Sequence, residues 1–469
     1  MASLRGPRIT RRAALAGALG GAGALALGLS GCGSTSGRLA AASGSTRETT
    51  WGDPVGDGQL RVLAGEPLTK RTDLGPVARD AGALVTLAHV TDAHVLDASS
   101  PARVTFLDRL GPPFQSTFRP QETLTTQVLA GTARAVRALS PAAVIQGGDL
   151  IDNVQHNELL HALQVLQGGW VSPGSGRGGY YGVQRGSDTD PFYYRPAVDA
   201  PRHPHLLRDA VARLHSPGVG APVLPVFGDH DALVAGTVAP TALTRALAIG
   251  ERALWNLPTG LTLPADLRAQ IGASPDGPPD PGAVGALLDQ ALRGPTVRVP
   301  PDPARRQLDV AATIGALRAA APPVLARGGD RLDYVLDLGA RVRLVVIDLA
   351  RRDGGSGGAV DPAQPAWLAR SLAEAGKRWV LVISYQPLAG SAGAAPMLAE
   401  LERSPRVVAV LNGHTHRNTI TPRPTAAGGY WEITTASLID YPQQARALQL
   451  RATADGGIAI HTWMLDRID

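Results

Sequence analysis

Residues 142–153 read AAVIQGGDLIDN, an apolar run that ends abruptly in two glycines and then in acidic and amide side chains. The same change from a short apolar run to a polar cluster occurs at residues 84–94, 223–231, 380–387 and 407–416. Short runs of this kind, rich in valine, leucine and isoleucine, predict strands that are buried on both faces. The sequence therefore predicts a sheet in which the polar clusters come directly after buried strands.

Segments with helical periodicity separate several of these runs, at residues 121–139, 158–166, 206–214 and 365–375. Alternation of strands and helices predicts a layered α/β fold. Ligands in such folds bind beyond the carboxyl ends of the strands, so we expect the five polar clusters to meet at one rim. Further strands are expected at residues 333–338, 341–347, 430–435, 447–452 and 458–463.

The N-terminal segment has the features of an export signal. Arg11 and Arg12 precede an apolar run, residues 13–29, which is too short and too glycine-rich for a permanent membrane span. Twin arginines in this position resemble a Tat-type signal, and residues 29–32 resemble a lipobox in which Cys32 is diacylated. An ordinary secretory signal with an incidental cysteine is the alternative. The prediction is a lipoprotein on the outer face of the cytoplasmic membrane, or a secreted protein.

These features predict a division of the chain into three parts. Residues 1–31 form the Tat-type lipoprotein signal peptide, and residues 32–60, which are rich in serine, glycine and threonine, form a flexible tether. Residues 61–469 form the folded domain, with a Pro- and Gly-rich insertion near residues 257–305. The loop at residues 168–200 holds four of the eight tyrosines in a chain that is only 4% aromatic. Its aromatic rings either line a substrate site or fasten the loop to the body.

Charge and cysteine content exclude some function classes. The formal net charge is +5, but residues 1–31 hold four arginines and no acidic residue, so the remainder has 41 basic and 40 acidic residues. A nucleic-acid-binding protein needs a concentrated basic face, so no nucleic-acid partner is expected. Cys32 is the only cysteine, which excludes an intrachain disulfide and a cysteine-based metal site.

The polar clusters contain the ligand types of a metal site. They read DAH at residues 92–94, GGDLIDN at 147–153, GDHD at 228–231 and GHTH at 413–416. Carboxylates and imidazoles without thiolates favour Mn, Fe, Zn or a mixed pair. In this order and spacing the clusters resemble D-x-H, G-D-x-x-D/N, G-N-H-D/E and G-H-x-H, the motif series of the calcineurin-like metallophosphoesterase family. The run from residue 430 to residue 446 also resembles an exported bacterial subgroup of that family.

This resemblance implies a layered α/β/β/α sandwich with the metal site at the carboxyl ends of the strands. It implies one or two divalent or mixed metal ions and a hydrolysis of phosphoric mono- or diesters through a metal-bound hydroxide. Carried over by position, the first metal would be held by Asp92, His94 and His416, the second by Asp229 and His414, and Asp149 would bridge the two. His230 would protonate the leaving oxygen, and Asp231 would orient His230. The expected substrate is a phosphorylated small molecule or lipid.

Two positions depart from the family pattern, and both concern the second metal. Asp229 stands where the family has Asn, and Tyr385 stands where it has a histidine in an H-x-P context. Two hypotheses are open: a working phosphoesterase with an altered second site, or a catalytically degenerate, lipid-anchored protein that binds a metal or a phosphorylated ligand. Tyr385 and Asn153 remain candidates for second-metal or substrate contact, although Asp152 and Asn153 fit a helix N-cap better.

Overall fold

Two β-sheets lie face to face at the centre of a computed structural model of the chain. The model describes residues 44–111, 114–176, 178–257, 277–322 and 330–468, with residues 265 and 269. The predicted signal peptide and Cys32 lie outside these residues. The five-stranded sheet has the order β17 (Ile458–Leu465), β16 (Ala445–Thr453), β3 (Asp80–Val90), β4 (Ala143–Gln146) and β7 (Val223–Pro225). The six-stranded sheet has the order β10 (Tyr334–Leu338), β11 (Val342–Ile347), β12 (Trp379–Ser384), β13 (Val407–Asn412), β15 (Tyr430–Thr434) and β14 (Thr419–Arg423).

The strands that precede the polar clusters run parallel within each sheet. β3, β4 and β7 are parallel neighbours, as are β11, β12, β13 and β15. A continuous apolar layer lies between the sheets and includes Leu87, Ile145, Leu381 and Leu411, all of which are fully buried. Burial of one such side chain contributes roughly 1.5–3 kcal/mol, so this layer fixes how the two sheets pack.

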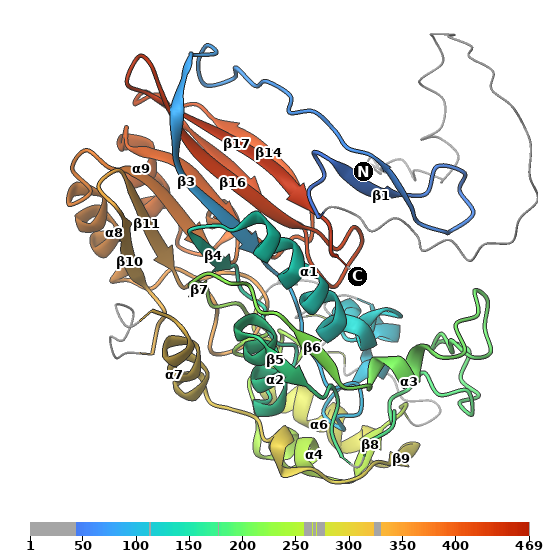
Figure 1. Ribbon diagram of the computed structural model, residues 1–469. Coiled ribbons are helices and arrows are strands. Elements are labelled where there is room, and N and C mark those ends of the chain that lie inside the picture. The colour runs from blue at the N-terminus through green and yellow to red at the C-terminus, as the bar shows by residue number, and fades with distance from the viewer. Residues whose placement is uncertain are drawn as a thin grey trace, which may run out of the picture. The chain divides into compact units, whose positions relative to one another are not determined.

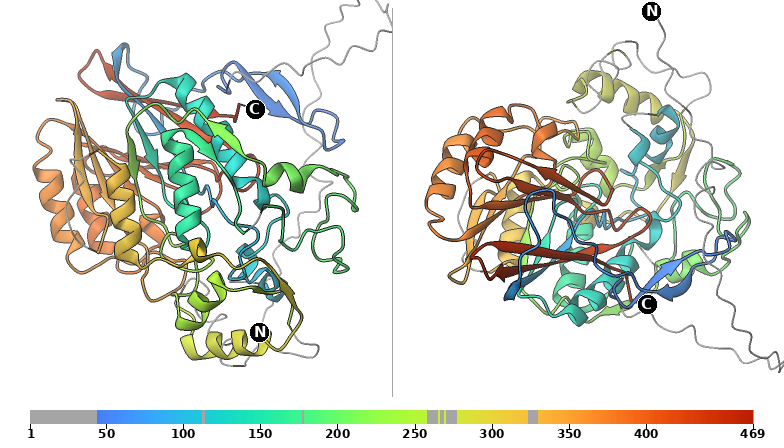
Figure 2. Two further views of the ribbon diagram at one scale, coloured as in Figure 1. Left: turned by 60° about the horizontal axis from the view of Figure 1, so that its bottom comes forward. Right: turned by 90° about the horizontal axis from the view of Figure 1, so that it is seen from above.

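Helices cover the outer face of each sheet (Figure 1). α1 (Thr125–Leu139) and α2 (His156–Gln167) pack on the five-stranded sheet through residues such as Val136 and Leu159. α8 (Gln364–Ala373) and α9 (Ala395–Arg403) pack on the six-stranded sheet through Leu368 and Met397. The expected α/β/β/α sandwich is confirmed, and Figure 2 gives two further views of its layers.

Much of the segment between β7 and β10 forms a smaller cluster at the bottom of Figure 1, with α4 (Ala242–Ile249), β8 (Arg252–Leu254), α6 (Pro281–Ala291) and β9 (Thr296–Arg298). α7 (Val310–Ala320) follows in the same segment but packs on the main core through Ile314 and Leu317. The described part of the predicted insertion at 257–305 is therefore partly regular: β9 pairs with β8, and α6 packs through Leu287 on Phe106. Among the described residues, no helix combines the length and the apolar composition that crossing a membrane requires.

The aromatic loop at residues 168–200 is fastened to the body. Tyr193 is fully buried and packs its ring edge-on against Phe118, and Trp255 lies on its other side. Trp170 is 53% exposed and lies in β5 (Gly169–Val171), where its ring meets His215 of β6 (Leu214–Ser216). Of the two alternatives for this loop, the one in which aromatic rings fasten it to the body therefore applies to Tyr193, its most buried aromatic residue.

Two expectations about local structure are wrong. The helix expected at 206–214 ends early: α3 covers only Leu206–Ala210, because Leu214 begins β6 and pairs with β5. The tether expected at 32–60 is folded in part of its described portion, where β1 (Thr49–Gly52) pairs with β2 (Arg61–Ala64). Thr50 donates a hydrogen bond of 2.8 Å to Asp466, so this strand is attached to the C-terminal segment.

Candidate metal centre

Backbone hydrogen bonds join the loops at the ends of the strands. The amide of Asp92 donates to the carbonyl of Gly148 over 3.0 Å, and the amide of His94 donates to the carbonyl of Asp149 over 3.0 Å. The amide of Gly413 donates to the carbonyl of Tyr385 over 3.0 Å. The clusters predicted from the sequence therefore meet at one rim, formed by both sheets.

The backbone of this rim is strained at the candidate ligands. Nine non-glycine residues in the described part of the chain have a positive φ angle, and five of them are candidate ligands. These five are Asp92, His94, Asp149, His414 and His416, with φ between 42° and 64°. A side chain in this region costs of order 1 kcal/mol or more, and such strain concentrates at functional sites. The turns direct the side chains inward at a cost that the surrounding hydrogen bonds offset.

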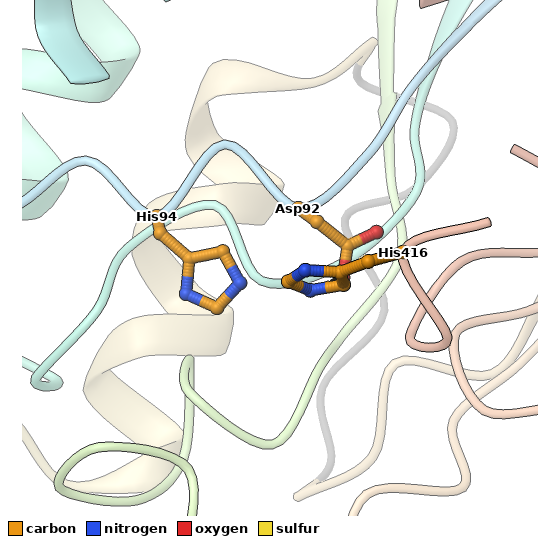
Figure 3. Close-up of side chains that lie close together, drawn as sticks. All are labelled: Asp92, His94 and His416. Atoms are coloured by element: carbon orange, nitrogen blue, oxygen red, sulfur yellow. Dashed lines mark ion pairs between the residues drawn. The ribbon is translucent and has the colours of Figure 1, made fainter. Parts of the chain in front are cut away.

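Asp92, His94 and His416 face a common space (Figure 3). Their ligand atoms lie within 4.8 Å of one another, and the nearest pair is His416 Nε2 and Asp92 Oδ1 at 3.2 Å. Asp149 Oδ2 lies 3.6 Å from His94 Nε2 and adds a fourth potential ligand atom to the group. His94 Nε2 is buried and has no hydrogen-bond partner.

This spacing fits a metal ion. Ligand atoms about 2.0–2.2 Å from a metal lie about 3–3.5 Å from one another in tetrahedral or octahedral geometry. A buried imidazole nitrogen without a partner is costly, and a metal ion among two imidazoles and two carboxylates would remove that cost. The described residues can therefore hold at least one divalent metal ion.

Carboxylates behind the imidazoles fix their orientation. Asp152 Oδ1 accepts a hydrogen bond of 3.1 Å from His94 Nδ1, and Asp440 Oδ2 accepts one of 2.6 Å from His416 Nδ1. Both histidines therefore carry a proton on Nδ1 and turn Nε2 toward the common space, as metal-binding histidines do. Asp152 was considered only as a helix cap in the sequence, and Asp440 was missed.

The pKa values of the two imidazoles diverge for physical reasons. Burial and the neighbouring His230 lower the pKa of His94 to about 4. Burial would also lower the pKa of His416, but the carboxylates of Asp92 and Asp440 raise it to about 9. A metal ion can thus bind His94 without displacing a proton at neutral pH, whereas it must displace one from His416.

Tyr385 is buried beside the acidic ligands. Its side chain is 1% exposed, and its hydroxyl lies 2.5 Å from Asp92 Oδ1 and within hydrogen-bond distance of Asp149 Oδ2. Burial and the nearby carboxylates raise the pKa of the phenol well above its usual value, so the hydroxyl keeps its proton and acts as a donor. Burial and the charge of Asp229 raise the pKa of Asp149 in the same way.

The residues expected at a second metal are less well gathered. His414 Nδ1 lies 3.5 Å from Asp229 Oδ1, and the same oxygen accepts a hydrogen bond of 3.1 Å from the side-chain amide of Gln386. Among the described residues, His414 belongs to no group of three potential ligands. The two further groups of this kind both contain His230, one with His94 and Asp152 and the other with Asp149 and Asp229.

His230 is oriented by a different residue from the one expected. Its Nδ1 lies 2.9 Å from the backbone carbonyl of Asp152 and 3.3 Å from the carboxylate of that residue. Asp231 instead accepts hydrogen bonds from the backbone amides of Gly228 at 3.0 Å, Leu150 at 2.9 Å and Ile151 at 3.2 Å. The carboxylate of Asp231 therefore joins two loops through these three amides, and its expected role beside His230 stays a prediction.

The N-cap expected at Asp152 and Asn153 is wrong. α2 begins at His156. The backbone amide of Asn153, which lies before the helix, donates a hydrogen bond of 2.9 Å to Oε2 of Glu158 in the first turn of α2. Asn153 donates from its side chain to Asp152 at 2.8 Å and is 1% exposed. Its amide nitrogen therefore supports Asp152, while its Oδ1 is buried without a hydrogen-bond partner, and its contact with a second metal or a substrate stays a prediction.

Comparisons with known proteins place the fold beside several solved structures. No family model and no curated protein sequence matches the chain. A dimetal phosphatase from Danio rerio is 14% identical, with a TM-score of 0.38, and the match covers 81% of this chain and 99% of that one. The sulfate thiohydrolase SoxB from Termus thermophilus is 14% identical, with a TM-score of 0.31, over 83% of this chain and 57% of that one. A purple acid phosphatase from seeds of yellow lupin (Lupinus luteus) is 10% identical, with a TM-score of 0.32, over 87% and 57%.

Proposed function

We propose that this chain is a metal-dependent phosphoric ester hydrolase of the calcineurin-like metallophosphoesterase family. One observation carries the proposal: the buried, unpartnered Nε2 of His94 faces the carboxylate of Asp92 and the imidazole of His416 at metal-ligand spacing. The motif series and the α/β/β/α layers agree with it. Asp92, His94, Asp149 and His416 would hold the metal, and Mn, Fe and Zn are the ions that these donors favour.

The residues around this pocket have separable tasks in the proposed reaction. A bound divalent ion would clamp the phosphoryl oxygens of the substrate and lower the pKa of a water molecule. His230 supplies a proton: burial disfavours its charge, but Asp149 and Asp152 raise its pKa to about 10, so it is protonated at neutral pH. Because Nδ1 of His230 faces the carbonyl of Asp152, the proton on Nε2 is free to move to a leaving alkoxide oxygen.

A catalytically degenerate metal- or phospholigand-binding protein is the second candidate. The observation that favours it is the placement of Tyr385, whose neutral hydroxyl stands beside Asp92 and Asp149 in place of the family's imidazole. Under this alternative the chain binds a metal but does not turn over esters.

Hydrolysis assays separate the two candidates. A generic aryl phosphodiester and the matching monoester are incubated with purified protein and added Mn²⁺, and bound metal is measured in the same samples. The hydrolase proposal expects turnover that Asp92→Asn lowers at least a hundredfold and that Asp289→Asn leaves unchanged. Asp289 is an exposed carboxylate on α6 and serves as a matched control. Bound metal without turnover of either ester under any divalent ion would establish the degenerate alternative.

We also propose an external, membrane-tethered location, which rests on residues 10–32 of the sequence. A diacylated Cys32 would anchor the chain stably, because two acyl chains suffice where one does not. Phosphorylated small molecules or lipids at the membrane surface are then the proposed substrates. Cys32→Ser should release the protein from the membrane fraction into the soluble fraction, and retention in the membrane fraction would refute the anchor.

A further inference from the structure

The position of Tyr385 determines how many metal ions the rim can hold. We infer that the chain holds one metal ion, in the pocket of Asp92, His94, Asp149 and His416, and that hydrogen-bond donors of Tyr385 and Gln386 occupy the place of a second. This inference rests on the proposed function for the nature of the pocket. It concerns residues 385 and 386 of this chain, where the family pattern has an imidazole.

The hydroxyl of Tyr385 lies against the acidic side chains of the pocket. Its oxygen lies 2.5 Å from Asp92 Oδ1, which is closer than two ligands of one ion normally approach each other. A distance of this kind is that of a short hydrogen bond to a charged oxygen. The hydroxyl also contacts Oδ2 of Asp149, the residue that the family pattern places between two ions.

The ring of Tyr385 is buried and packs closely against the backbone of the rim at Gly148. A Cβ atom on Gly148 would lie 2.4 Å from Cδ2 of the tyrosine ring, so the ring fills the space that this glycine leaves open. Gly148 also has φ of 108°, which other residues rarely adopt. The ring meets His414 edge-on, with centroids 5.3 Å apart, while its hydroxyl reaches Asp92 and Asp149 of the first pocket.

The acidic residues of the second position are already engaged. Asp149 Oδ1 accepts a hydrogen bond of 2.9 Å from the amide of His230, while its Oδ2 shares the single hydroxyl proton of Tyr385 with Asp92 Oδ1. Asp229 Oδ1 accepts 3.1 Å from the side-chain amide of Gln386, and this is the oxygen nearest to His414. A second cation would have to displace both the hydroxyl of Tyr385 and the amide of Gln386. An ion in the first pocket would compete only with the hydroxyl of Tyr385 at Asp92 and Asp149, and it would gain an imidazole nitrogen that has no partner.

The count of ions tests this inference directly. Purified full-length protein is loaded with Mn²⁺, freed of excess ion, and measured by mass spectrometry and by electron paramagnetic resonance. We expect one equivalent per chain and the spectrum of an isolated Mn²⁺ ion. Tyr385→His, which restores an imidazole in the H-x-P context, should raise the content to two equivalents and give an exchange-coupled spectrum.

Tyr385→Phe is the matched control, because it keeps the ring and removes the hydroxyl without adding a ligand. It should retain one equivalent. Two equivalents in the unaltered chain, or one equivalent in a folded Tyr385→His variant, would overturn the inference. If Tyr385→His does not fold, the content and spectrum of the unaltered chain decide alone. A tyrosinate charge-transfer band after loading with ferric iron would also overturn it, because Tyr385 would then be a ligand.

The outcome for this inference is distinguishable from the outcome for the proposed function. One bound ion without ester hydrolysis would leave the metal count intact and refute the hydrolase. Two bound ions with hydrolysis would leave the hydrolase intact and refute the role of Tyr385.

Discussion

Asp440 offers a sharp test of how the pocket binds its metal, because it touches a ligand without being one. Its Oδ2 accepts 2.6 Å from Nδ1 of His416, and this keeps the proton on Nδ1 and leaves Nε2 for the metal. Asp440→Asn preserves the shape of the side chain and removes its charge. The neutral amide oxygen can still accept the hydrogen bond, so the variant isolates the electrostatic contribution.

The expected magnitude is set by the pKa of His416. Against the effect of burial, Asp92 and Asp440 together raise that pKa from 6.5 to about 9. One pKa unit corresponds to about 1.4 kcal/mol, and loss of a carboxylate behind a metal-binding histidine typically weakens metal affinity about 10–100-fold. Loss of the carboxylate also weakens the binding of the proton that competes with the metal for Nε2. We therefore expect the low end of this range, an increase of about tenfold in the Kd for the metal.

Metal affinity is measured by competition between the protein and a fluorescent chelator for Mn²⁺ at pH 8. Arg119→Gln is the informative control, since Arg119 Nε lies 3.2 Å from Asp440 and removing this cation leaves the contact between Asp440 and His416 in place. We expect Arg119→Gln to bind Mn²⁺ no more weakly than the unaltered chain. If Asp440→Asn binds within a factor of two of the unaltered chain, Asp440 serves only as an ion-pair partner of Arg119, and the reasoning is refuted.

Three further predictions concern pH, burial of charge and the joining of loops. The pKa of His416 is raised to about 9, so below that pH a metal ion must displace a proton from this histidine. The apparent affinity for Mn²⁺, measured by calorimetry, should therefore rise about tenfold per pH unit from pH 6.5 to 9. An affinity that does not change with pH would contradict this. Arg305 is fully buried, and its guanidinium lies 3.3 Å from the carboxylate of the buried Asp97. Arg305→Met should therefore lower the free energy of unfolding by roughly 3–5 kcal/mol in urea titrations. A decrease of less than about 1 kcal/mol would show that the other hydrogen-bond donors of Asp97 satisfy its carboxylate. Asp231→Asn should lower the free energy of unfolding by about 1–3 kcal/mol in the same titration. The reason is that an amide side chain has only one acceptor oxygen for the three backbone amides that donate to Asp231. Unchanged stability together with lost turnover would instead support the expected role of Asp231 beside His230.

The ends of the strands could be predicted because the residues that indicate each end are neighbours in the sequence. Valine- and leucine-rich runs identify buried parallel strands, and the direction of the chain then places the residues after each run at the same rim. This reasoning recovered the strands that precede Asp92, Asp149, Asp229, Tyr385 and His414. The short helix α3 was overestimated because the periodicity of residues 206–214 continues into β6, where pairing with β5 determines the structure.

Asp440 was missed although the sequence contained a usable signal. β15 was expected as a strand, and it pairs parallel to β13, so its carboxyl end lies on the same rim as His414 and His416. The segment after β15 should therefore have been treated as a sixth polar cluster. Asp152 was misassigned for a different reason, since a helix cap and a histidine partner are both acceptor roles, and only the three-dimensional path of the loop distinguishes them.

The two departures from the family pattern make physical sense as one change rather than two. As separate changes they oppose each other, because an added carboxylate at residue 229 strengthens a cation site while a phenol at residue 385 weakens it. Around a site without a second cation they agree: the acidic oxygens require donors, and the hydroxyl of Tyr385 and the amide of Gln386 supply them. Neutral donors satisfy the lone pairs of Asp149 and Asp229 but leave their charge uncompensated, which is why burial together with Asp229 raises the pKa of Asp149. The chain would thus exchange the charge of a second ion for hydrogen bonds, and the single remaining ion would carry the electrostatic part of phosphoryl transfer together with His230.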